Sequence, residues 1–173
     1  QPEKATESNA SWSLATGSDA TASNAAKGSD DADGQTPGTP VKTLAVAIKR
    51  AEELQEKAGC DSSQITIYAM NPMEIKDGQL YVLNGNHIRI ASWAGRSYQS
   101  DLIFYVNGGQ LTLVNTRLES DKREGAARDN QLLFMDGGTL QLGGEVEIDG
   151  QIVMNYTSED YLLWDIATGS DAE

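Results

Sequence analysis

The chain has 173 residues, 39% of them hydrophobic, which is enough for one domain with a modest core. It carries 26 acidic and 13 basic residues, and its formal net charge of −13 repels nucleic-acid phosphates and anionic membrane surfaces, so nucleic acid is not an expected partner. Cys60 is the only cysteine, so no disulfide can form within the chain, and no apolar run reaches the roughly 18 residues that span a bilayer, so no membrane insertion is expected.

The first 38 residues are poor in apolar side chains and rich in Ala, Ser, Thr, Asn, Asp and Gly. Such a segment cannot bury enough apolar surface to offset the entropy of ordering, so residues 1–38 are predicted to be a flexible spacer. Residues 12–20 (WSLATGSDA) return as residues 164–172 (WDIATGSDA) with seven identities in nine. Residues 161–173 are therefore interpreted as a C-terminal strand and a copy of the spacer, which favours a module from a tandem array.

An amphipathic helix is predicted over residues 40–57. Thr39 can cap it with Pro40 in the first helical position, or Thr43 can cap it instead. Gly59 suits the left-handed residue that ends many helices. The apolar stripe predicted for this helix is Leu44, Ala47, Ile48, Ala51 and Leu54.

An eight-residue phrase recurs after the helix, as 83–90 (LNGNHIRI), 106–113 (VNGGQLTL) and 135–142 (MDGGTLQL), with weaker echoes at 75–82 and 148–153. Its Asn or Asp stands at positions 84, 107 and 136, at intervals of 23 and 29 residues. Such intervals are typical of solenoids, in which each repeat buries its apolar face against the next. Strand-like runs occupy 65–70, 80–83, 87–92, 102–106, 111–118, 132–135, 139–142, 146–148, 152–156 and 161–166.

Two architectures accommodate these strands. In an antiparallel β-sandwich, the Asn-Gly and Asp-Gly pairs are hairpin turns. In a parallel β-helix, the same glycines form corners, Asn84, Asn107 and Asp136 stack as a ladder, and Ile88/Ile90, Leu111/Leu113 and Leu140/Leu142 form inward aliphatic columns. The return of a whole phrase in phase favours the β-helix, because a hairpin needs only its turn.

Two segments resemble a known family. Residues 38–51 (GTPVKTLAVAIKRA) followed by 65–68 (ITIY) resemble the opening of pectin-lyase-like right-handed β-helix domains, where a capping helix leads into the first coil. Residues 137–148 (GGTLQLGGEVEI) resemble coils of such domains in large cell-surface proteins of Gram-positive anaerobes, where Ala-Thr-Gly-Ser spacers also occur. The resemblance covers about residues 36–156. It implies an all-β, right-handed parallel β-helix over residues 39–160, with an N-terminal capping helix, in an extracellular or cell-surface protein.

Catalytic members of the resembled family use clustered carboxylates for glycoside hydrolysis, or a Ca²⁺-bound acidic group with a base for proton abstraction. Neither motif maps onto this sequence, and no nucleophile elbow, phosphate loop or Cys/His metal spacing is present. Asp121, Glu124 and Asp129 are interleaved with basic residues, which argues against a Ca²⁺ cage. The sequence therefore predicts no enzyme, no cofactor and no metal site.

The best candidate for recognition is a flank built from two polar insertions, residues 93–101 and 119–130. Aligning the repeats places them side by side, and their aromatic and mixed-charge side chains suit stacking on a sugar ring or contact with a protein. The alternative is that Trp93 only packs over the solenoid and the charges are solvated. The candidate binding residues are Trp93, Arg96, Tyr98, Asp101, Lys122, Arg123 and Arg128.

The predicted function is a non-catalytic extracellular β-helical module that acts as a structural spacer or as an adhesive unit binding carbohydrate or another surface protein. One alternative is a fragment of a carbohydrate-active β-helix enzyme, either a polysaccharide lyase or a glycoside hydrolase. Another is a self-assembling filament subunit, with neighbouring copies of the chain as partners.

Overall fold

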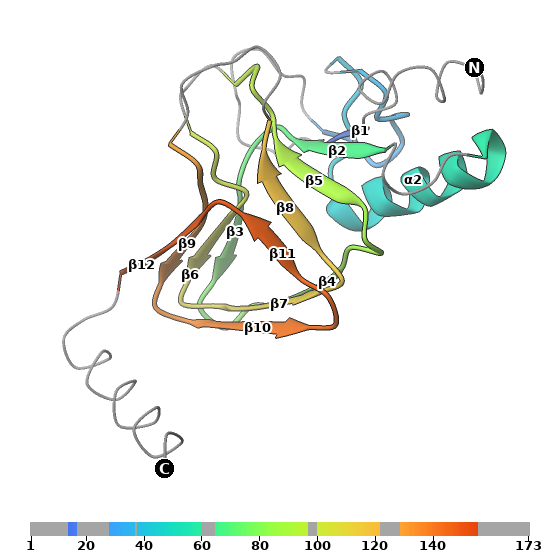
Figure 1. Cartoon of the computed structure of the whole chain (residues 1–173). Helices are drawn as coiled ribbons and strands as arrows, with labels where there is room; N and C mark the ends of the chain where they lie inside the picture. Colours follow the sequence, from blue (N-terminus) through green and yellow to red (C-terminus); the bar gives the residue numbers. More distant parts are fainter. Residues whose placement is uncertain are drawn as a thin grey trace.

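The computed structural model describes residues 14–16, 28–36, 38–59, 65–96, 100–121 and 129–155. These residues form parallel β-sheets and one helix, so the prediction of a β-rich fold is confirmed (Figure 1). Every pairing between the named strands is parallel. The antiparallel sandwich is therefore wrong as an alternative.

The strands belong to three sheets, here called A, B and C. Sheet A has the order β1 (Leu14–Thr16), β2 (Thr66–Ala69), β5 (Arg89–Ser92), β8 (Arg117–Ser120) and β11 (Glu147–Asp149). Sheet B has the order β3 (Met73–Lys76), β6 (Phe104–Asn107), β9 (Gln131–Asp136) and β12 (Gln151–Asn155). Sheet C has the order β4 (Leu80–Asn84), β7 (Gln110–Val114) and β10 (Thr139–Gly143). From β2 onward the chain visits A, B and C in this order repeatedly, and one passage is called a circuit.

The glycine pairs of the repeated phrase form the corners between sheets B and C. Gly108 and Gly137 have φ of 81° and 68°, a left-handed conformation that side chains disfavour. Gly138 stacks directly on the Gly109 of the preceding circuit, where an added Cβ would overlap the Gly109 carbonyl oxygen. The chain therefore turns into a new sheet at these glycines, and the hairpin interpretation of the same residues is wrong.

The register of the phrases is partly as predicted. The second and third phrases pair as expected, with Asn107 opposite Asp136 and Leu111 opposite Leu140. The first phrase lies in different sheets from the other two. Its Asn84 ends β4 in sheet C and pairs with Val114, whereas Asn107 ends β6 in sheet B. The predicted Asn84, Asn107 and Asp136 ladder is therefore wrong at Asn84, and Asn155 of β12 extends it beyond Asp136 instead.

The weaker echo at residues 75–82 is the true counterpart of the second phrase. Ile75 pairs with Val106, and Tyr81 pairs with Leu111. Three residues separate β3 from β4, whereas two separate β6 from β7, and this additional residue hides the match in the sequence.

Asn115 divides a predicted strand into two. The sequence predicts one strand over residues 111–118, but Asn115 has φ of 48° and ends β7 before β8 begins. Its Oδ1 accepts a 3.0 Å hydrogen bond from the Glu145 backbone N–H in the next circuit. Asn can adopt this left-handed conformation more readily than most residues. The corner between sheets C and A is thus built on Asn115, and β1 and β3 are strands that the sequence analysis does not predict.

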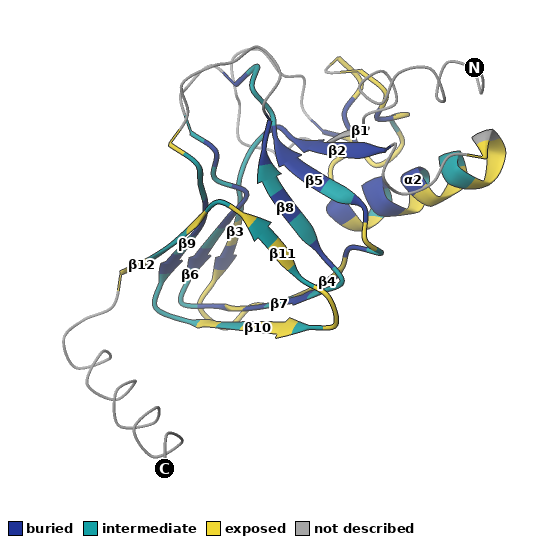
Figure 2. Cartoon of the chain, viewed as in Figure 1, coloured by how far each residue is buried: buried dark blue, intermediate teal, exposed yellow. Residues whose placement is uncertain are grey.

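The three sheets enclose a shared apolar interior (Figure 2). Apolar residues that are register partners in neighbouring strands stack through successive circuits. Each sheet therefore contributes inward columns of apolar side chains. The buried columns include Ile67, Ile90 and Leu118 in sheet A, Ile75, Val106 and Met135 in sheet B, and Leu83 and Leu113 in sheet C. Ile88 and Ile90 are buried as predicted, but Ile90 stacks with Ile67 and Leu118 in sheet A and not with the leucines of β7 and β10. Leu142, which the sequence predicts to be buried, is 55% exposed, although its register partner Leu113 is buried.

Helix α2 (Leu44–Ala58) packs against β1 and β2 at the N-terminal end of the sheets (Figure 1). Thr43 is the N-cap of the helix, because its side chain accepts a hydrogen bond from the Val46 N–H. Gly59 ends the helix in a left-handed conformation with φ of 68°, as predicted. Leu44, Ala47, Ile48 and Ala51 are buried. In the part of the chain that the structure describes, no helix has the length and apolarity to cross a membrane.

Asp30 holds the N-terminus of α2. Its Oδ1 accepts hydrogen bonds from the backbone N–H groups of Lys42 (3.0 Å) and Thr43 (2.9 Å), and its carbonyl accepts from Arg50 (2.8 Å). Nearby, the Asp33 carboxylate accepts from the Thr39 hydroxyl (2.6 Å) and the Gln35 N–H (3.0 Å). These two hydrogen bonds lower the pKa of Asp33 below its ordinary value of 3.8, and the bond from Thr39 has the larger effect.

Candidate functional site

The predicted flank lies where the chain passes from sheet A to sheet B. The loops at this corner differ greatly in length, since residues 70–72 follow β2, residues 93–103 follow β5, residues 121–130 follow β8, and only Gly150 follows β11. The two middle circuits therefore carry the long loops, which we call the A–B loops.

The A–B loops lie side by side, as the repeat alignment predicts. The Ala94 N–H donates to Asp121 Oδ2 (2.9 Å), the Asp101 N–H donates to Asp129 Oδ1 (3.1 Å), and the Asn130 N–H donates to Asp101 Oδ2 (2.8 Å). Each bond joins a carboxylate to a backbone amide of the neighbouring loop. The carboxylates of these loops thus fix the two loops to each other.

Asp101, a predicted binding residue, is completely buried. Its Oδ1 accepts a 2.8 Å hydrogen bond from the Ser92 hydroxyl, itself buried, while Oδ2 accepts from Asn130. A buried carboxylate is costly unless such bonds compensate the lost hydration. Asp101 therefore stabilises the loop pair and does not face solvent.

Arg96 is also buried and bonded to carbonyl groups. Its Nη2 donates to the Ala69 carbonyl (2.8 Å) and its Nη1 donates to the Ser100 carbonyl (2.9 Å). Trp93 is half-buried, and its indole lies over Gly95, where a Cβ would overlap the ring. Trp93 is thus the described member of the predicted set that retains exposed surface. Tyr98, Lys122, Arg123 and Arg128 lie outside the described residues.

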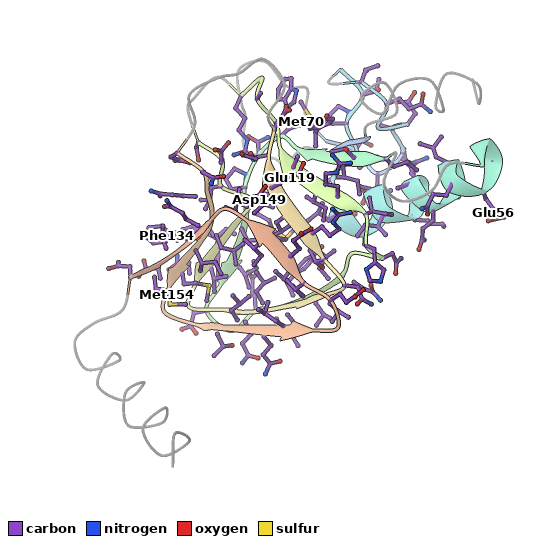
Figure 3. All side chains as sticks on the ribbon, in the orientation of Figure 1. Glu56, Met70, Glu119, Phe134, Asp149 and Met154 are labelled. Carbon is purple, nitrogen blue, oxygen red and sulfur yellow. The ribbon has the colours of Figure 1, made fainter. Side chains whose placement is uncertain are left out.

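A second surface, which the sequence analysis missed, is the outer face of sheet B. Tyr105 and Phe134 are register partners on β6 and β9, and their rings meet edge to face with centroids 5.7 Å apart. Both alternate with buried inward residues, and both are half-buried. Figure 3 labels Phe134 on this side of the molecule. The 29-residue spacing of the second and third phrases could have revealed this aromatic pair.

Hydrogen-bonded polar groups flank the aromatic pair on the four strands of sheet B. Asn107 Nδ2 donates to Glu74 Oε2 (3.0 Å), Asn155 Nδ2 donates to Asp136 Oδ1 (3.4 Å), and the Tyr105 hydroxyl donates to Asp136 Oδ2 (3.4 Å). The pKa of Tyr105 is raised above its ordinary value of 10.0. Desolvation is the largest cause, followed by the negative charge of Asp136 and the hydrogen bond to it. The phenol therefore stays protonated near neutral pH and remains a hydrogen-bond donor.

Metal-binding groups and hollows are the next features of the described residues. Among them, no group of three or more His, Cys, Asp or Glu side chains is arranged to hold a metal ion. A hollow of about 120 Å³ beside α2 is lined by Asp33, Gln35, Arg50, Glu53, Leu54 and Lys57. This volume is below the range of roughly 300–1,000 Å³ that small-molecule sites occupy. The outer face of sheet B can instead offer an aromatic surface beside hydrogen-bonding groups.

Comparisons of the chain with protein-family models, curated proteins and solved structures found no match.

Proposed function

We propose that this chain is a non-catalytic, right-handed parallel β-helix module of an extracellular or cell-surface protein, with a carbohydrate-binding face on sheet B and the adjoining A–B loops. The repeated order of sheets A, B and C supports the β-helix, because each circuit returns to a parallel strand of the same sheet. Connections between parallel strands of one sheet are right-handed in nearly all proteins, which supports the handedness.

The Tyr105–Phe134 pair on the outside of sheet B carries the proposal of binding. Sugar rings present apolar C–H faces and hydroxyl edges, so an aromatic surface beside amide and carboxylate groups complements both. Glu74, Asn107 and Asp136 supply those polar groups. Trp93 of the A–B loops adds a further aromatic surface in the proposed site.

The surroundings of Asp101 and Asp121 in the A–B loops support binding without turnover at these loops. Glycoside hydrolases place two carboxyl groups about 5–9.5 Å apart across the scissile bond, where both reach the substrate. Asp101 and Asp121 are buried, and both bond to backbone amides of the protein. These two carboxylates are therefore poorly placed to exchange protons with a polysaccharide.

A glycan array and a cell-binding assay test the proposal. The double variant Tyr105→Ala with Phe134→Ala should lose most of the signal, whereas Thr112→Ala, on the outer face of sheet C, should bind like the unaltered protein. Trp93→Ala with Tyr98→Ala tests the contribution of the A–B loops. Circular dichroism must show that each variant is folded. Binding unaffected by both double variants would reject this face.

Catalysis is tested separately by incubating purified protein with polysaccharides. The proposal expects no new reducing ends and no unsaturated products, and cleavage that persists through rigorous purification would favour the alternative of a carbohydrate-active enzyme fragment. The filament alternative has one observation in its favour, the exposed apolar side chains Leu142 and Met154 in the last strands of sheets C and B.

A further inference from the structure

Two rows of side chains cross the outer face of sheet B, from β3 to β12 (Figure 1). Alternate residues of a strand share one face, and register partners on neighbouring strands line up, so the outward residues form rows. We call one the aromatic row, which consists of Glu74, Tyr105, Phe134 and Val153. The other is the polar row, which consists of Lys76, Asn107, Asp136 and Asn155. Both rows run across the strands, along the direction in which the circuits stack.

The aromatic row presents three apolar side chains on successive strands. Tyr105, Phe134 and Val153 are each half-buried, so each residue keeps some surface exposed to solvent. Neighbouring strands lie about 4.7–4.9 Å apart, which is close to the length of one sugar unit in an extended glycan. A linear glycan laid across the strands would therefore bring one unit to each of the three side chains, whereas a glycan laid along a strand would meet only one of them.

The polar row runs beside these side chains and is joined to them by hydrogen bonds. The Asp136 carboxylate accepts from the Tyr105 hydroxyl and from the Asn155 amide, each at 3.4 Å, and the Glu74 carboxylate accepts from the Asn107 amide at 3.0 Å. A carboxylate has about four acceptor positions and a side-chain amide has two N–H groups. These groups can therefore also bond the hydroxyls on the edge of a sugar ring that stands on the aromatic row.

The charge of this face is negative. Glu74 and Asp136 contribute carboxylates to the two rows, and Lys76 contributes an ammonium group. Desolvation is the largest cause that raises the pKa of Tyr105, and the charges of Asp136 and Glu74 raise it further. An anionic sugar held about 4 Å from one carboxylate loses roughly fivefold in affinity even in the dielectric of water. The net charge of −13 on the whole chain adds to this repulsion.

We propose that the ligand of this face is an uncharged linear glycan whose chain lies across the strands of sheet B. Its sugar rings stack on Tyr105, Phe134 and Val153, and its hydroxyls bond the polar row. Acidic polysaccharides, such as those built from uronic acids, are excluded from the face by Glu74 and Asp136. This inference rests on the proposed carbohydrate binding, to which it adds the class of the glycan and the direction of the chain.

An array of linear glycans, grouped as neutral, uronic-acid-containing and amino-sugar chains, tests the class of ligand with the full chain. The signal should be confined to the neutral group. A stronger signal on acidic or amino-sugar glycans would overturn the inference and leave carbohydrate binding in place. The absence of signal on every glycan would instead reject the proposed function, and the inference with it.

The role of the two carboxylates is tested by removing their charge. In Glu74→Gln with Asp136→Asn, the ratio of acidic to neutral glycan binding should rise at least about fivefold, because the local repulsion is gone. The matched control is Glu147→Gln with Asp149→Asn, which makes the same change of net charge at exposed positions on the outer face of sheet A. An unchanged ratio, or an equal rise in the control, would overturn the exclusion of acidic glycans by this face.

The direction of the chain is tested at the far end of the aromatic row. Val153→Ser should weaken binding of the strongest neutral glycan by about threefold or more in isothermal titration calorimetry, because the unit over β12 loses its apolar contact. Val82→Ser, at an exposed outward position of β4 in sheet C, is the control and should bind like the unaltered protein. Circular dichroism confirms that both variants are folded. A Val153→Ser variant with unaltered affinity would show that the glycan does not extend across the strands.

Discussion

The sharpest test of the inward columns compares two neighbouring residues of β7. Leu111 is completely buried, and its register partners are Tyr81 and Leu140. Thr112 is next in the strand and points outward, where its hydroxyl contacts Gln141 Oε1 at 3.3 Å. Replacing each by Asn introduces the same side chain on opposite faces of one strand. The expected result is a large loss of stability for Leu111→Asn and a small one for Thr112→Asn.

The magnitude follows from burial. Full burial of a leucine side chain contributes about 1.5–3 kcal/mol, and a buried amide without partners costs about 1–3 kcal/mol more. Leu111→Asn should therefore lower the free energy of unfolding by roughly 2.5–6 kcal/mol, which is a large share of the about 5–15 kcal/mol of a typical domain. Thr112→Asn forfeits one exposed hydrogen bond and should cost less than about 1 kcal/mol.

Urea unfolding followed by circular dichroism measures both differences. The midpoint should fall strongly for Leu111→Asn with an unchanged slope, because the slope reports the surface exposed on unfolding. The control Gln141→Asn, on the outer face of β10, should behave like Thr112→Asn. Equal stabilities for the Leu111 and Thr112 variants would show that the interior is not formed by these columns.

Three further predictions concern single aspartates. Asp30→Ala should lower the free energy of unfolding by about 1–2 kcal/mol in urea melts, because the start of α2 loses its acceptor, while Asp31→Ala should have little effect. Asp101→Asn should cost about 1–3 kcal/mol in the same assay, because an amide cannot accept at both positions that the carboxylate serves, and exposed Asp77→Asn should be neutral. The lowered pKa of Asp33 means that its contribution to stability is complete above its unfolded value near 3.8 and is lost as the pH falls through the folded value. Asp33→Asn should therefore weaken the acid dependence of stability below about pH 4, and an unchanged pH profile would count against it.

The helix and the phrase spacing could be predicted because each rests on local chemistry. Gly59 ends α2 as expected, since the left-handed conformation there favours glycine. The 29-residue step between the second and third phrases also holds, because both contain the same two-residue corner. By contrast, one added residue between β3 and β4 was enough to conceal the true first repeat. Direct matching of phrases cannot follow an insertion at a corner.

The candidate site was only partly accessible to sequence reasoning for a different physical reason. The repeat alignment placed the A–B loops together, but it could not tell which polar side chains face solvent. Arg96 and Asp101 look like surface residues in the sequence, yet both are buried and hydrogen-bonded in the structure. Composition does not distinguish a charged group that meets a ligand from one that satisfies a neighbouring loop's backbone.

The burial of these groups also explains how long loops can be added to a solenoid corner. A loop placed over the sheets carries backbone N–H and C=O groups that need partners once water is excluded. Asp101, Asp121 and Asp129 accept from backbone amides, and Arg96 donates to two carbonyls, so the loops' side chains replace part of the missing solvent. The circuit formed by β11 and β12 has only Gly150 at this corner and needs no such groups. The polar side chains of the long loops are therefore explained first by the backbone groups that they bond. The partly exposed Trp93 and the outer aromatic pair of sheet B are the better candidates for contact with a ligand.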